Sequence, residues 1–162
     1  MRDKLIHSAE GQRSFVVVLD SGEEAMACLQ RFAEAHGIGA AQFTAIGAFS
    51  DADLAYFDWE QKTYLPERIE EQVEVAALTG DIALGPDGKP ALHAHCVLGH
   101  RGGRASAGHL TRGRVRPTLE IVLTESPAHL RKRHDPETGL TLIDLDASAP
   151  STPINEAPAI AP

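Results

Sequence analysis

The chain has few aromatic residues and few cysteines. Aromatic side chains make up 5% of its 162 residues, so the core has to rest on Val, Ile, Leu and Ala. The two cysteines, Cys28 and Cys96, each stand alone inside an apolar pattern, which excludes a disulfide framework and a CxxC metal pair. Isolated, reduced cysteines are typical of a cytosolic protein, and we therefore predict a cytoplasmic location.

Long apolar segments and a basic charge balance are also missing. The first residues lack the apolar stretch of a signal peptide, and no run approaches the roughly 18 apolar residues of a membrane helix. We expect a soluble protein without a membrane partner. The net charge of −8 disfavours a protein that binds DNA through its phosphates. The length and the 43% hydrophobic content favour one globular domain.

An amphipathic helix is predicted near the N-terminus. The β-branched run at 14–20 predicts a buried strand that leads into it. Ser21 and Glu24 fit a capping box, and apolar residues at helical spacing across 25–36 predict the helix itself. Gly37 follows as a left-handed terminator.

The rest of the chain alternates as short strands do. We expect strands at 42–49, 52–58, 64–65, 70–78, 81–84, 92–98, 104–107, 118–124 and 140–145. One helix followed by many strands predicts an α+β fold, a mostly antiparallel β-sheet with flanking helices. The spacing leaves open whether the sheet closes on itself. We place the domain at 1–145, and the Pro/Ala-rich segment 146–162 is predicted to be a flexible tail.

Three of the eight histidines fall in LHAHCVLGH, residues 92–100. Because residues two apart in a strand share a face, His93 and His95 project side by side, with Cα atoms about 6.6–6.8 Å apart. Two such imidazoles can meet one cation at about 2.0–2.1 Å. A hairpin would return His109, in AGHL, toward them, whereas His100 lies beyond Gly99 and is the weaker candidate.

Three histidines with an open fourth position are typical of a catalytic or ligand-binding metal site rather than a closed structural one. Zinc, copper, nickel and iron all suit three imidazoles. The alternative is that neutral histidines serve as hydrogen-bonding members of a polar pocket. Two acids, Glu120 and Glu74, are candidates for orienting an imidazole or for acid–base catalysis, unless they are ordinary exposed carboxylates of a sheet.

A resemblance to a known family rests on an ordered set of motifs. They are FTAIGAFSDADLAYFD, EVAALTGDIAL, LHAHCVLG, AGHL and TLEIVL. Together they resemble the PPC ("plants and prokaryotes conserved") domain family over roughly 14–145. The resemblance implies a compact α+β homotrimer with a metal site at His93, His95 and His109. It also implies a fold similar to that of acetolactate decarboxylase, a zinc enzyme that uses three histidines.

Members of this family are often labelled as predicted DNA-binding proteins, and in plants the domain follows AT-hook segments. The nearest match to an AT-hook core here is TRGRVRPT, 111–118, which Val115 and Arg116 interrupt. We interpret it as a turn and the entry to a strand, and the basic segment 129–134 as a solvated surface turn.

Three functions follow. The first is a trimeric small-molecule-binding, metal-binding or regulatory module that holds zinc or another divalent transition metal. The second is a DNA-binding protein, and the third is a zinc-dependent enzyme of lyase or hydrolase type. DNA binding would depend on the arginines of two basic segments, Arg101, Arg104, Arg112, Arg114 and Arg116.

Overall fold

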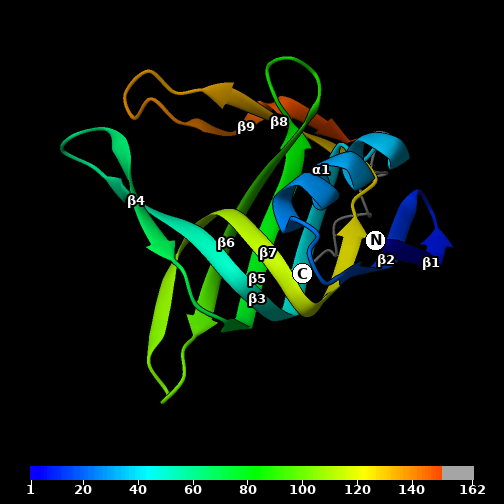
Figure 1. The fold of residues 1–162 in the computed structure, drawn as a ribbon. Coiled ribbons are helices and arrows are strands. Elements are labelled where there is room, and N and C mark those ends of the chain that lie inside the picture. Colours follow the sequence, from blue (N-terminus) through cyan, green and yellow to red (C-terminus); the bar gives the residue numbers. More distant parts are fainter. Residues whose placement is uncertain (151–162) are drawn as a thin grey trace, which may run out of the picture.

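The computed structural model describes residues 1–150, which form a single sheet and one helix (Figure 1). In chain order the elements are β1 (Arg2–Ala9), β2 (Gln12–Asp20), α1 (Ala25–His36), β3 (Ala40–Asp58), β4 (Thr63–Ile69), β5 (Val73–Leu84), β6 (Pro90–Gly99), β7 (Ala105–Glu125), β8 (Ala128–His134) and β9 (Thr141–Pro150). Among these residues no helix combines the length and hydropathy that crossing a membrane requires.

Four strands close the sheet into a ring. β3 pairs with both β5 and β7, and β6 pairs with the same two strands from the other side. All four pairings are antiparallel, so the predicted mostly antiparallel sheet is confirmed. The spacing of the strands in the sequence did not decide whether the sheet closes on itself, and these pairings show that it does. One helix is present in residues 1–150, where flanking helices were expected.

The core lies between α1 and the inner face of the sheet. Alternate residues of β2 and β7, such as Val17, Leu19, Leu119 and Ile121, have no exposed surface. The apolar stripe of α1 packs on this face and completes one continuous cluster. Cys96 is 3% exposed within it, as the alternation of β6 predicts.

The helix begins at a different cap from the one predicted. Glu24 itself is the N-cap, and its carboxylate accepts hydrogen bonds from the backbone N–H groups of Met26 and Ala27, at 3.1 and 2.6 Å. Ser21 lies in the preceding turn, so the proposed pair of Ser21 and Glu24 is wrong. Gly37 ends the helix with φ of 64°, as predicted.

Two predicted turns are interior parts of long strands. The expected turn at Ser50 and Asp51 lies inside β3, and 111–118 lies inside β7, where Arg114 pairs with Asp51. Register shifts on both sides of Phe49 show that the pair bends here without breaking. A bulge carries the same polar, β-interrupting residues as a turn, which explains the error.

The two ends of the chain add strands at the edges of the sheet. β1 is exposed along its whole length and was not predicted. The basic segment 129–134 falls within β8 rather than in a surface turn, because it pairs with β9. β9 continues past residue 145 to Pro150. Residues 151–162, most of the predicted tail, lie outside the described part of the chain.

Candidate metal centre

Two neighbouring strands bring the three predicted histidines together. His95 on β6 and His109 on β7 are directly opposite each other in the antiparallel register. His93 lies two residues before His95 and shares its face, because the intervening Ala94 is buried. The three rings are close neighbours, with centroids 5.0 to 5.4 Å apart.

The nitrogen atoms converge as ligands of one ion would. One ligand atom from each histidine lies within 4.8 Å of the other two, and the Nε2 atoms of His93 and His95 are 3.2 Å apart. Tetrahedral ligands with bonds of about 2.05 Å lie about 3.3 Å from one another, so this pair already has the required spacing. Nδ1 of His109 is buried without a hydrogen-bond partner. The donor set therefore fits a divalent transition metal.

Electrostatics keeps two of the imidazoles neutral. Burial, followed by the neighbouring His93 and His95, lowers the pKa of His109 from 6.5 to about 4. Burial and the nearby His93 also lower the pKa of His95. A metal binds only the neutral form of the ring, so these shifts favour ligation at neutral pH.

Asp81 and Lys132 belong to this site, although the sequence analysis did not select them. Asp81 on β5 pairs with His93, and its Oδ2 lies 3.4 Å from His93 Nδ1. Its Oδ1 lies 2.7 Å from Nζ of Lys132, an ion pair outside the angular range of a hydrogen bond. A carboxylate beside the second ring nitrogen is the usual support of a metal-binding histidine. The one local sequence signal for Asp81 is that it is a charged residue within the apolar end of β5.

Lys132 on β8 is an unusually buried lysine, because its side chain is only 5% exposed. Its ammonium group also donates to the backbone carbonyl of Ala91, at 3.3 Å. The β8 strand thus contributes a fixed positive charge beside the histidines. On the opposite side, the ring of Tyr64 from β4 lies 5.0 Å from that of His109.

The structure does not bring the two predicted acids into contact with the histidines. Glu120 lies on the exposed face of β7, opposite Ile46 of β3. Glu74 pairs with Gly99, seven residues along β5 from Asp81, a separation of roughly 20 Å in an extended strand. Neither carboxylate forms a hydrogen bond or ion pair within residues 1–150. Their suggested catalytic role stays a prediction.

His100, the weaker candidate, belongs to a separate hydrogen-bonded set. Its Nδ1 lies 2.8 Å from Oε1 of Glu71, and its Nε2 lies 3.0 Å from Oγ of Ser106. The side chain is 8% exposed. This network ties the loop before β5 to the β6–β7 hairpin and keeps His100 apart from the three clustered histidines.

The arginines of the AT-hook-like segment are mostly engaged within the protein. Arg112 lies 2.6 Å from an oxygen of Asp51 and donates to Asp53 at 2.7 Å. These carboxylates raise its pKa further above its ordinary value. Arg114 lies 3.8 Å from Asp51. In contrast, Arg101 and Arg104 are exposed and form no ion pair within the described residues.

The fold and the site define a class: a closed, mostly antiparallel sheet that presents three convergent histidines from two adjacent strands. The profile of the Plants and Prokaryotes Conserved (PCC) domain matches residues 6–127. The chain belongs to this family, as the motifs predicted. No curated protein sequence matches it.

Solved structures with the same fold agree with this assignment. A plant- and prokaryote-conserved (PPC) protein from Pyrococcus horikoshii is 30% identical, with a TM-score of 0.76 over 82% of this chain and 91% of its own. A metal-containing protein from Archaeoglobus fulgidus is 31% identical, with a TM-score of 0.75 over 88% and 98%. A protein from Ralstonia eutropha, provisionally described as DNA-binding, is 31% identical, with a TM-score of 0.75 over 81% and 90%.

Proposed function

We propose that this protein is a metal-binding module that holds a divalent transition metal, with zinc the first candidate, through His93, His95 and His109. The observation that carries the proposal is the convergence of one nitrogen from each ring within 4.8 Å. The buried, unpartnered Nδ1 of His109 supports it, since such an atom is costly without a ligand. The metal-containing relative from Archaeoglobus fulgidus gives independent support.

The experiment is metal content by elemental mass spectrometry, for the purified protein and for His93→Ala. We expect about one metal per chain in the wild type and loss of that metal in the variant. His7→Ala is the matched control, because His7 is exposed on β1 at the far edge of the sheet. Equal metal content in the wild type and in His93→Ala would show that the ligand assignment is wrong.

The same site supports an enzymatic function as an extension of metal binding. A bound zinc ion polarises a carbonyl or lowers the pKa of a water molecule, the chemistry of a zinc-dependent lyase or hydrolase. Around it, Asp81 would orient His93 and the depressed pKa of His109 would keep that ligand neutral. Glu120 and Glu74 would carry protons only if substrate or a second subunit bridged their distance from the histidines.

DNA binding is the second candidate function, and the provisional description of the Ralstonia eutropha relative favours it. Of the five candidate arginines, Arg101, Arg104 and Arg116 form no ion pair within residues 1–150. Arg112 and Arg114 face Asp51 and Asp53. The net charge of −8 weakens the attraction to phosphates further. Retention on duplex DNA at low salt, lost steeply as salt rises, would support this function over the first.

We also propose that the protein assembles as a cytoplasmic homotrimer. The support is an exposed apolar surface on the outer face of the sheet, where Ile46 is 62%, Val122 49% and Val97 39% exposed. Ala76 and Ala77 continue this surface between the larger side chains. A contiguous apolar patch of this kind is typical of a protein–protein contact.

A further inference from the structure

A pocket of about 410 Å³ lies beside His93 and His109. Its size is within the range of small-molecule sites, which begins at about 300 Å³. The floor comes from β5, β6 and β7, and the wall comes from the β8–β9 hairpin and the residues just before β9. The family profile ends at residue 127, so this wall lies outside the part of the chain that the profile matches.

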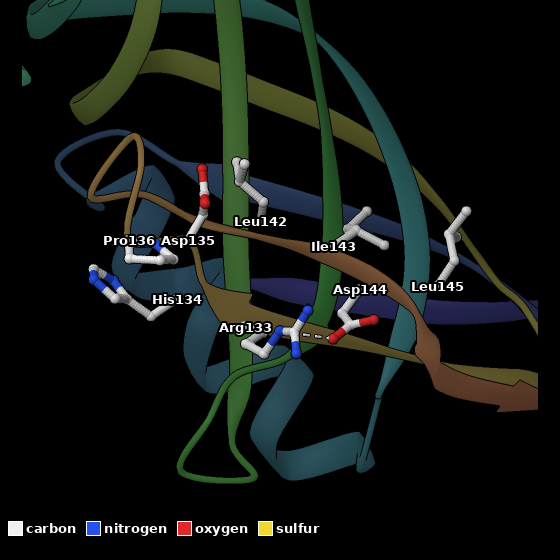
Figure 2. Close-up of a pocket in the computed structure, with 8 residues that line it drawn as sticks. All are labelled: Arg133, His134, Asp135, Pro136, Leu142, Ile143, Asp144 and Leu145. Atoms are coloured by element: carbon white, nitrogen blue, oxygen red, sulfur yellow. Dashed lines mark ion pairs between the residues drawn. The ribbon is translucent and has the colours of Figure 1, made fainter.

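The wall is aliphatic. Five apolar residues line the pocket: Ala91, Leu92, Leu140, Leu142 and Ile143. Ile143 is the register partner of Lys132, so it shares the face that Lys132 turns to Asp81, and it remains 41% exposed. Leu142 pairs with Arg133 on the opposite face of the hairpin. Leu142 and Ile143 also line a neighbouring pocket at this hairpin, which Figure 2 shows with the ion pair of Arg133 on β8 and Asp144 on β9. The hairpin therefore holds exposed apolar groups in a fixed position at the pocket.

The charges of the pocket favour an anion. Asp81 is the one acidic residue that lines it, and its charge is cancelled by Lys132 at 2.7 Å. Histidines bind a metal as neutral rings, so a divalent ion held by them would leave the pocket with a net positive charge. A ligand that suits both features has an anionic oxygen group at the metal end and an aliphatic body at the hairpin end.

We propose that this pocket binds a small carboxylate with an aliphatic chain of about four to eight carbons, the carboxylate directed to the metal site and the chain packed on Leu140 and Ile143. The proposal rests on the metal site proposed above. It adds the class of ligand, and it assigns the β8–β9 hairpin as the element that contacts the aliphatic chain of the ligand. The polar groups of Tyr64 and Thr141 lie on the same lining and leave room for a further oxygen on the ligand.

The test is calorimetric titration of the zinc-loaded protein with acetate, butanoate, hexanoate and octanoate. Burial of one methylene group is worth about fourfold in affinity, and a half-open wall lowers this to about twofold. We expect the affinity to rise two- to fourfold per methylene up to hexanoate. Hexylamine, with the same chain and the opposite charge, should not bind.

Variants separate the hairpin from the metal. Ile143→Ser should remove most of the chain-length dependence while zinc content and acetate affinity stay unchanged. Leu145→Ser is the matched control on the same strand, since Leu145 is 78% exposed and does not line this pocket. It should behave as the wild type.

Each failure has a distinct meaning. Affinity that is independent of chain length, hexanoate binding that is unchanged in Ile143→Ser, or equal binding of hexylamine would overturn the ligand assignment while the metal site stands. If the protein takes up no zinc, the proposed function fails first, and titration of the metal-free protein with hexanoate then shows whether the aliphatic pocket exists without it.

Discussion

The carboxylate of Asp81 lies 3.4 Å from Nδ1 of His93, on the side of the ring away from the Nε2 atom that faces His95. The two residues are register partners on β5 and β6, so the strand pairing itself fixes their contact. A carboxylate in this position selects the tautomer that leaves Nε2 free for a metal. Five predictions follow from this site and from the sheet that holds it.

Asp81→Asn should weaken metal binding without abolishing it. The amide can still hydrogen-bond to His93, but it lacks the charge that strengthens the imidazole as a ligand, and it leaves the buried Lys132 without its counter-ion. Loss of such a supporting group typically costs about 10- to 100-fold in metal affinity. Competition with a chelating dye measures the change. Affinity equal to that of the wild type would show that Asp81 only pairs with Lys132.

The stability of the metal-free protein should fall as the pH drops from about 6.5 toward 4. In the folded state the pKa of His109 is lowered to about 4 by burial and by its neighbouring histidines, whereas in the unfolded chain it returns to 6.5. The unfolded state therefore takes up protons more readily in this window, so the contribution is complete above pH 6.5 and is lost as the pH falls through 4. Urea unfolding at several pH values, with chelator present, measures the change.

The comparison for that experiment is His109→Gln, whose side chain has similar polarity and does not titrate. All other ionisable groups are shared, so the difference between the two pH profiles isolates His109. Its profile should be flatter than that of the wild type between pH 6.5 and 4. Identical slopes would show that His109 is free to protonate in the folded protein.

Gly80→Ala should destabilise the sheet next to the metal site. A Cβ atom at Gly80 would lie 2.4 Å from Cζ of Phe43 and 2.5 Å from the backbone oxygen of His93. Neither can move without disturbing the core or the β5–β6 pairing, and overpacking of this kind costs about 1–3 kcal/mol. Gly99→Ala is the control, because its nearest contact would be an ordinary 3.7 Å. Thermal unfolding compares the two, and equal melting temperatures would contradict the prediction.

Ile46→Asp should dissociate the proposed homotrimer. Ile46 is 62% exposed on the outer face, opposite Glu120, so an aspartate there costs the isolated chain only a solvent-screened contact between like charges. In a buried contact the same charge is strongly unfavourable. Light scattering after size-exclusion chromatography gives the mass, and circular dichroism checks the fold. Leu145→Asp, at another exposed leucine, should leave the mass unchanged. A wild type that is monomeric would remove the basis of this prediction.

Cys96 should resist thiol reagents in the native protein. Burial raises the pKa of its thiol to about 12, so almost no thiolate is present at neutral pH. Burial also raises the pKa of Cys28. Both should react with a disulfide reagent only after denaturation. Fast labelling of either cysteine in native buffer would show that the core opens beside β6 or α1.

The sequence alone determined the elements whose signals are local. The helix, its glycine terminator and the strands with clean alternation are read from neighbours three, four or two residues away. His93 and His95 followed from that alternation, since one strand decides that they share a face. Placing His109 near them required only the assumption of a hairpin, and the resemblance to the family implied that the three histidines form one site.

The tertiary structure decided what depends on partners distant in the sequence. Bulges kept β3 and β7 continuous where local residues indicated turns, because pairing along the whole strand outweighs one interrupted position. Asp81 joined the site, and the predicted Glu120 and Glu74 did not come into contact with it, because register between strands sets which side chains meet. Lys132 and Ile143 reached the pocket beside the histidines only through the β8–β9 hairpin, whose position no pattern within residues 128–150 specifies.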